Sequence, residues 1–348
     1  MNILYFTQYY PPEGHGGSVC VKHIVERLSK TNNLLVATSY KPNPNSYPRT
    51  KIVSSHRFRG VLSFNLAHIS NVKTLLKSST FKPDVILSQH QVHHLASLSA
   101  IITGKIDNVP VVIRAEDVIV GPLPLLKIHH TLQGYFINEL TLLLGKRIDR
   151  FLVVSTEIQD MLSKRGFRDD TLRLSPNGVD LRAFSNRKLD HLKEEYGCSN
   201  VVILMGSMAP ADRVENLINA IPIVRRDYPD TLFVLLGSGD VLESMIHLAR
   251  EKSLTNYIHT PGMIDHSGVP WFLSNSDVGI GPLRFSLENR MTIPMKLVEY
   301  MASSLPVISA PVSRDILIHN WNGLVTEDPS PESVADAICT VLSDDVLS

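Results

Sequence analysis

Three glycine-bearing loops and one short helix carry the residue types that could bind a phosphorylated ligand. The first loop, residues 11–18, contains Gly16 and Gly17 and leads into an apolar helical stretch. Glycine lets the backbone approach a ligand, and a helix start offers free N–H groups to an anion. The loop matches neither the G-x-x-x-x-G-K-[ST] nor the G-x-G-x-x-G pattern, so a plain tight turn is the alternative.

Comparable signals follow in the second half of the chain. Gly237 ends one apolar run, and Gly262 with Met263 ends the next, where backbone groups could lie beside a flat base. Ordinary turn chemistry would also explain these glycines. Lys296 and Glu299 are three residues apart, so their side chains share one helix face near its start. A surface ion pair between the two is the alternative interpretation.

The elements that must position these residues are short apolar runs alternating with helical segments. The first series predicts strands at 3–6, 34–38, 85–88, 111–113 and 151–154, with helices at 19–30, 72–78 and 94–102. The second predicts strands at 201–205, 232–236, 257–259, 278–280 and 307–309, with helices at 214–226, 242–251 and 296–303. Strands that are apolar almost throughout are typical of a parallel sheet covered on both faces.

The fold class predicted is α/β, with two Rossmann-like doubly wound domains facing each other across a cleft. Residues 184–199 are polar, lack a strand and separate the two series. We therefore expect domains at 1–183 and 200–348 with a linker at 184–199. In doubly wound sheets ligands bind beyond the carboxyl ends of the strands, where the glycines above are expected.

Composition narrows the function classes. The 348 residues contain 34 Lys+Arg and 34 Asp+Glu, so no net field favours nucleic acid. The three cysteines lie far apart and lack C-x-x-C spacing, which argues against a disulfide framework or a zinc site. No leader-like segment and no membrane-length apolar run occurs, and we expect a cytoplasmic setting.

Four segments stand in the order seen in one large family: residues 7–17, 175–184, 236–239 and 294–307. With them the chain resembles the retaining glycosyltransferases of GT-B fold (group 1, family 4), especially the branch that builds cell-surface polysaccharides. The resemblance implies that Glu299 holds the ribose hydroxyls of a nucleotide-sugar donor. It implies also that Gly16 and Gly17 pack against the diphosphate and the donor sugar.

Several positions depart from the commoner family pattern. Met291 stands where many members have a first glutamate, and Glu288 is out of register. Ser207 and Asp212 stand where an arginine and a lysine usually grip the diphosphate, and Arg213 follows. The usual first-domain histidine is replaced by Glu116, followed by Asp117. The crossover helix that ends most members is expected to be missing.

The implied reaction cleaves the bond between an anomeric carbon and a nucleoside diphosphate, so the site should direct cations and dipoles at the leaving phosphate. The expected diphosphate and sugar ligands are Gly16, Gly17, Ser207, Arg213, Thr292 and Lys296. The expected nucleoside ligands are Gly237, Gly262, Met263 and Glu299. Glu116 and Asp117 would orient a donor hydroxyl or the acceptor, with an ordinary polar loop as the alternative. The sequence lacks Asp-x-Asp, so we expect no metal and no cofactor.

The acceptor is expected to be a glycan or a lipid-linked molecule. A peripheral membrane contact is predicted from apolar residues 118–126 and 140–144 with neighbouring Lys127, Lys146 and Arg147. The donor favoured is a UDP-linked N-acetylhexosamine, with GDP-mannose possible. His90, His93 and His94 lack metal-site spacing and are expected to line a surface or cleft. A nucleotide-sugar epimerase and a non-catalytic nucleotide-binding protein are the rival functions.

Overall fold

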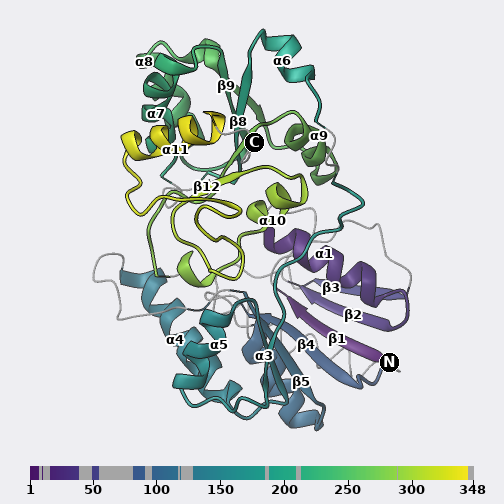
Figure 1. Cartoon of the computed structure of the whole chain (residues 1–348). Helices are drawn as coiled ribbons and strands as arrows, with labels where there is room; N and C mark the ends of the chain where they lie inside the picture. The colour runs from purple at the N-terminus through teal and green to yellow at the C-terminus, as the bar shows by residue number, and fades with distance from the viewer. Residues whose placement is uncertain are drawn as a thin grey trace. The chain divides into compact units, whose positions relative to one another are not determined.

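The computed structural model describes residues 1–7, 10, 16–38, 49–54, 81–90, 96–116, 118, 128–184, 188–208, 213–287 and 289–343. The chain forms two compact units, Met1–Pro176 and Asn177–Ser348 (Figure 1). Within the described residues, each unit contains one sheet whose strands all run parallel. Both sheets follow the doubly wound strand order, so the predicted fold class of two Rossmann-like halves is confirmed.

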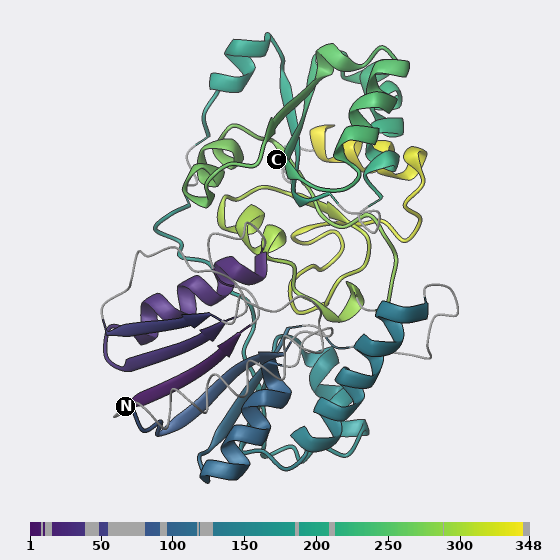
Figure 2. The same ribbon diagram turned by 180° about the vertical axis from the view of Figure 1, so that it is seen from behind.

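The sheet of the first unit has the order β3-β2-β1-β4-β5-β6-β7 among its described strands. These are β1 (Asn2–Thr7), β2 (Asn33–Thr38), β3 (Thr50–Ser54), β4 (Val85–His90), β5 (Val111–Ala115), β6 (Arg150–Val153) and β7 (Leu172–Leu174). The described helices are α1 (Gly16–Leu28), α3 (Ala96–Asp107), α4 (Ile128–Gly145) and α5 (Thr156–Lys164). Helix α1 covers one face of the sheet and α3 the other (Figure 2).

The sheet of the second unit has the order β10-β9-β8-β11-β12-β13. Its strands are β8 (Asn200–Ser207), β9 (Thr231–Ser238), β10 (Ile258–Gly262), β11 (Val278–Ile280), β12 (Val307–Ser309) and β13 (Gly323–Val325). The described helices are α6 (His191–Tyr196), α7 (Val214–Asp227), α8 (Leu242–Glu251), α9 (Val269–Ser274), α10 (Met295–Ala302) and α11 (Pro331–Ser343). Three 3₁₀ turns, Thr255–Tyr257, His266–Gly268 and Asn289–Met291, lie between them.

Continuous apolar strands arise because both faces of this sheet are buried. In β8, Val202 and Leu204 pack into a core with α7 and α11. The alternate residues Val201 and Ile203 pack into a second core with α10. Side chains of a strand point to opposite faces in turn, so each residue of the run meets one core or the other.

In three pairs of adjacent strands, an aspartate immediately before one strand accepts a hydrogen bond from the amino end of the other. Asp84, before β4, accepts a hydrogen bond from the N–H of Asn2 at 2.7 Å. Asp149, before β6, accepts one from the N–H of Val111 at 2.9 Å. Asp277, before β11, accepts one from the N–H of Val201 at 2.8 Å. Each carboxylate thereby satisfies a strand-end donor and helps to fix the start of the adjacent strand.

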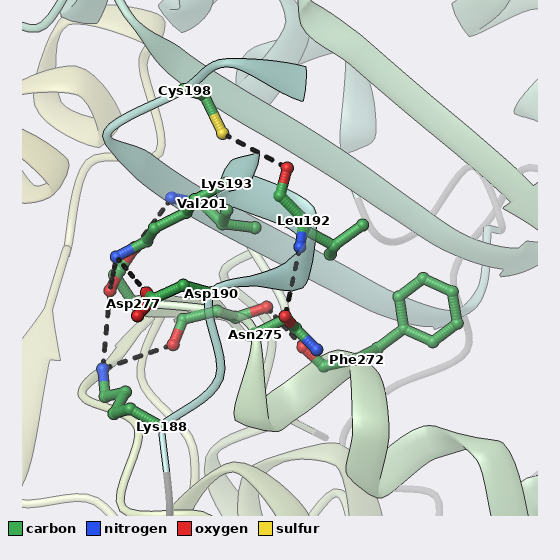
Figure 3. Close-up of polar contacts among 10 residues, drawn as sticks. Lys188, Asp190, Leu192, Lys193, Cys198, Val201, Phe272, Asn275 and Asp277 are labelled. Carbon is green, nitrogen blue, oxygen red and sulfur yellow. Dashed lines mark hydrogen bonds and ion pairs between the residues drawn. The ribbon is translucent and has the colours of Figure 1, made fainter. Parts of the chain in front are cut away.

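The expected linker, residues 184–199, lies in the second unit wherever the structure describes it. Figure 3 shows how its polar side chains fasten it to the amino end of the sheet. Lys193 Nζ lies 2.9 Å and Lys188 Nζ 3.5 Å from Asp277 Oδ1. The N–H of Leu192 donates to Asn275 Oδ1 at 3.2 Å. The boundary between the two compact units accordingly lies between Pro176 and Asn177, before this segment.

The predicted strands and helices all have counterparts, except for the helix at 72–78, which lies outside the described residues. The structure adds strands and α-helices that the sequence did not predict: β3, β7, β13, α4, α5, α6, α9 and α11. Residues 140–144 belong to helix α4. Among the described helices, none combines the length and apolar character needed to cross a bilayer.

Candidate functional site

Three glycines line the carboxyl edge of the second sheet, and together they form what we call the glycine edge: Gly206, Gly237 and Gly262. Gly206 is paired with Gly237 in the β8–β9 register, and Gly262 with Leu236 in the β9–β10 register. A Cβ at Gly237 would lie 2.1 Å from the carbonyl oxygen of Gly206, and its φ is +134°. Only glycine satisfies both conditions, so the strand ends can pass each other closely.

Lys296, the second residue of α10, lies over this edge. A Cβ at Gly206 would stand 3.4 Å from Lys296 Cε and 3.5 Å from Nζ. Gly206 therefore leaves room for the lysine stem, and the ammonium group is held beside the backbone of β8. The lysine charge and the first N–H groups of α10 are both suited to an anion.

Glu299 lies one turn further along α10 and is 6% exposed. Its Oε1 is 2.7 Å from Nε2 of His266, which belongs to the 3₁₀ turn after β10. Glu299 is thus hydrogen-bonded to His266, a partner that the sequence did not indicate. The His266 ring contacts Phe184 edge-on, with centroids 6.4 Å apart.

The remaining predicted donor ligands of the second unit are spread over several loops. Ser207 is exposed at the end of β8, and Met263, just after β10, is 59% exposed. Thr292 is part-buried ahead of α10, where its hydroxyl donates to the carbonyl oxygen of Asn289 at 3.2 Å. Asn177 donates to the carbonyl oxygen of Ile293 at 2.7 Å and so anchors this loop.

Arg213 opens helix α7 in the left-handed region, with φ at +54°. Its Nη1 lies 3.3 Å from Glu215 Oε1, so the guanidinium forms an ion pair with an acidic neighbour. The Arg213 side chain is 55% exposed, and a surface pair of this kind contributes little free energy, so Arg213 remains a candidate phosphate ligand. Asp212 lies outside the described residues.

In the first unit, Glu116 follows β5 at the carboxyl edge of the sheet and is almost enclosed by a polar network. Arg114 Nη1 donates to Oε1 of Glu116, and Gln89 Nε2 donates to Oε2. Thr7 at the end of β1 donates to Gln89 Oε1 at 3.4 Å. Arg114 also donates to the carbonyl oxygen of Ser175 at 3.4 Å. Glu116 is thus an oriented carboxylate rather than part of an ordinary polar loop.

Gly16 and Gly17 form the first turn of α1, which therefore begins three residues earlier than predicted. Asp117 lies outside the described residues, as do His93 and His94. His90 is fully buried at the end of β4, so the expectation of a surface or cleft-lining residue is wrong for it. Its Nε2 is 3.3 Å from Asn138 Oδ1, and burial lowers the pKa of His90 to about 4. Among the described residues no His, Cys, Asp and Glu cluster could hold a metal ion.

Sequence reasoning missed His266, Arg114 and Gln89. Gln89 and Arg114 are polar residues near the carboxyl ends of β4 and β5, a position that could have marked them. His266 had no comparable signal, because its partner is 33 residues away.

Two family models match the chain. Residues 14–183 match Glycosyltransferase Family 4, and residues 199–344 match Glycosyl transferases group 1. Between them the models leave only residues 1–13, 184–198 and 345–348 unmatched.

The chain belongs to the GT-B glycosyltransferases.

Individual members of this family are distant from the chain. Alpha-monoglucosyldiacylglycerol synthase of Acholeplasma laidlawii is 25% identical over 40% of the chain and 36% of its own length. A GDP-mannose-dependent alpha-(1-6)-phosphatidylinositol monomannoside mannosyltransferase of Mycobacterium tuberculosis is 26% identical over 50% of the chain and 47% of its own length. The chain thus matches half or less of the length of these curated relatives.

The fold also matches a solved glycosyltransferase-like structure over the whole chain. Anabaena HepE, crystallised with UDP and glucose, superposes with a TM-score of 0.77 at 18% identity. The match covers 100% of this chain and 91% of HepE. At this identity the likeness concerns the GT-B fold alone.

Proposed function

We propose that the protein transfers a sugar from a nucleotide-sugar donor to a glycan or lipid-linked acceptor, with retention of the anomeric configuration and without a metal ion. The observation that carries the proposal is helix α10. It sets Lys296 over the glycine edge and Glu299 one turn further on, so a cation and a carboxylate on one helix are available for a diphosphate and a ribose. Membership of the glycosyltransferase family supports the same assignment.

In the proposed reaction an acceptor hydroxyl oxygen forms a bond to the anomeric carbon while the bond from that carbon to the diphosphate oxygen breaks. The electron pair leaves with the diphosphate, and the acceptor proton passes to the departing phosphate. Lys296 and the amino end of α10 stabilise the negative charge that develops there. Glu116, held by Arg114 and Gln89, accepts a hydrogen bond from a hydroxyl of the donor sugar or of the acceptor. Asp117, Ser207, Thr292, Gly16 and Gly17 are proposed to complete the sugar and diphosphate contacts.

We propose a UDP-linked N-acetylhexosamine as donor. The Pro-x-Lys-x-x-Glu-Tyr-Met-Ala sequence at 294–302 supports this choice through its likeness to polysaccharide-building enzymes. GDP-mannose is the second candidate, and the mycobacterial relative is named for that donor. Gly262 and Met263 would lie beside the base, since β10 ends at the glycine edge.

We further propose that the protein acts at a membrane surface. Phe136 and Leu143 are seven residues apart on α4, hence on one helix face, and are 67% and 62% exposed. Lys146 and Arg147 follow the helix and suit anionic headgroups. One relative is named as the synthase of a glucosyldiacylglycerol and another as a phosphatidylinositol monomannoside mannosyltransferase, and these names support a lipid-linked acceptor. Flotation with anionic vesicles should carry the protein upward, and the F136D/L143D double variant should remain at the bottom.

One experiment separates transferase from its rivals. The purified protein is incubated with UDP-N-acetylglucosamine, UDP-glucose or GDP-mannose, with and without a lipid extract, in EDTA. A transferase releases nucleoside diphosphate and forms a glycolipid with the donor's anomeric configuration only when acceptor is present. A new nucleotide-sugar formed from donor alone would indicate an epimerase, and binding without any product would indicate a non-catalytic protein. Activity that is present without EDTA and lost in EDTA would contradict metal independence.

A further inference from the structure

His266 and Glu299 form a contact that links two elements of the second unit. His266 stands in the 3₁₀ turn that follows β10, and Glu299 in α10. Their side chains meet at 2.7 Å between Nε2 and Oε1, while the carboxylate is 7% exposed. Burial of a carboxylate is unfavourable unless a hydrogen-bond donor satisfies it. This hydrogen bond therefore favours one rotamer of Glu299.

The direction of the hydrogen bond follows from the chemistry of the two groups. An ionised carboxylate only accepts, so Nε2 of His266 carries the proton and donates it. Among the residues that the structure describes, the other carboxylate oxygen, Oε2, has no hydrogen-bond partner. One oxygen is therefore fixed by the protein and the other remains to accept hydroxyl groups.

We propose that His266 is a positioning residue that sets the protein's preference for ribonucleotides over nucleotides lacking the ribose hydroxyls. It holds the Glu299 carboxylate so that Oε2 faces the ribose diol of the bound nucleotide. This inference rests on the proposed function, because it takes Glu299 as the ribose ligand. Phe184 supports the arrangement by its edge contact with the imidazole ring.

Calorimetry of the full chain measures this preference as the ratio of two dissociation constants. The probes are UDP and 2′,3′-dideoxy-UDP, and GDP with its dideoxy analogue if UDP does not bind. The matched variants are His266→Phe, which keeps a ring against Phe184 without a donor, and His266→Gln, whose amide keeps a donor. Glu299→Ala and the H266F/E299A double variant complete a cycle that isolates the coupling of the two residues.

The wild type should bind the ribonucleotide at least about tenfold more tightly than the dideoxy analogue, as expected for hydrogen bonds to a charged group. H266F should reduce this ratio to within about threefold by weakening ribonucleotide binding alone, and H266Q should restore most of it. In the Glu299→Ala background H266F should have no further effect on the ratio.

Failure of the inference differs from failure of the proposed function. If Glu299→Ala abolishes the ratio while H266F leaves it intact, or lowers both affinities equally, His266 is merely structural and the inference is overturned. If H266F fails to fold, the H266Q variant is the test. Its glutamine keeps a hydrogen-bond donor, so a loss of the ribonucleotide-to-dideoxy ratio in H266Q would overturn the inference. If the wild type binds no ribonucleotide, or binds both probes equally, the proposed site itself is wrong.

Discussion

Lys296 shows how a single side chain could replace a missing pair of cations. Ser207 stands where the family usually has arginine, and Arg213 is engaged with Glu215. Lys296 lies against Gly206, at the strand end where the proposed diphosphate site is. On this proposal, Lys296 and the amino end of α10 supply positive charge to the leaving group.

Replacing Lys296 by methionine should remove that charge while keeping most of the stem. UDP affinity should fall about tenfold to a hundredfold, since hydrogen bonds to charged groups are worth about 1.5–3 kcal/mol. Uridine affinity should be unchanged, because the proposal assigns Lys296 to the diphosphate, which uridine lacks. Calorimetry with both ligands gives the answer, and an equal loss for uridine would show that Lys296 does not act on phosphate.

His90 predicts a pH effect on stability. Its pKa is about 4 in the folded chain and 6.5 when unfolded, because burial disfavours the imidazolium. Between these values the unfolded chain binds more protons, so stability present above pH 6.5 is lost as the pH falls towards 4. The loss should be about 3 kcal/mol, at 1.36 kcal/mol per pKa unit. Urea unfolding across this range should show it, and His90→Gln should lack this component; identical pH profiles would refute the assignment.

At the residue scale the sequence indicates strand ends but not side-chain contacts. Glycines after apolar runs pointed to Gly237 and Gly262, and the parallel topology brings Gly206 beside Gly237 at the same edge. The partner of Glu299 could not be foreseen, because His266 reaches it only when the turn after β10 meets α10.

Helix α10 is seated on the second sheet by Tyr300, a fully buried residue at its centre. The Tyr300 hydroxyl accepts from the N–H of Met205 at 3.0 Å and donates to the carbonyl oxygen of Ile280 at 3.2 Å. It thereby bridges β8 and β11, on either side of the point where the strand order reverses. Burial raises the pKa of this phenol. The register of Lys296 and Glu299 depends on this anchor.

Tyr300→Phe should leave both backbone groups without their partner and reduce the free energy of unfolding by about 1–3 kcal/mol. Tyr228→Phe is a matched control, because its hydroxyl makes one contact of 3.5 Å and should cost less than about 0.5 kcal/mol. Urea denaturation of the three proteins measures the difference. Equal stabilities would mean that the phenol does not anchor α10.

Strands with continuous apolar runs were predictable, even the three-residue β11 and β12, whose residues are all buried. Strands β8 and β9 bury most of their residues, so their composition alone identified them. In β7 only Leu172 is buried, and β13 begins with Gly323, so neither presents such a run. Helix α6 was missed because its six residues bury only Leu192.

The whole molecule repeats one topology in its two units, and this repetition was visible in the sequence as two strand–helix series. The position of the boundary between the two units was harder to predict from the sequence. Residues 184–199 looked like a linker because they are polar, yet Lys188 and Lys193 use that polarity to bind Asp277. Polar composition therefore does not distinguish a linker from a surface segment tied down by ion pairs.

Most of the groups proposed to bind the nucleoside diphosphate, including Lys296 and Glu299, lie in the second unit, whereas Gly16 and Gly17 lie in the first. An excised fragment of residues 177–348 should therefore bind UDP with an affinity within about tenfold of the full chain, a difference of about 1.4 kcal/mol. Circular dichroism establishes that the fragment is folded, and calorimetry measures binding. A folded fragment that does not bind would show that the first unit supplies an essential nucleotide contact.

The central claim is that Glu299 holds the ribose of a bound nucleotide. Calorimetry of the Glu299→Ala variant with UDP, or with GDP if the wild type prefers it, tests this claim most directly. We predict a dissociation constant raised about a hundredfold, as expected when hydrogen bonds to a charged group are lost, with an unchanged melting curve. A dissociation constant equal to that of the wild type would contradict the account.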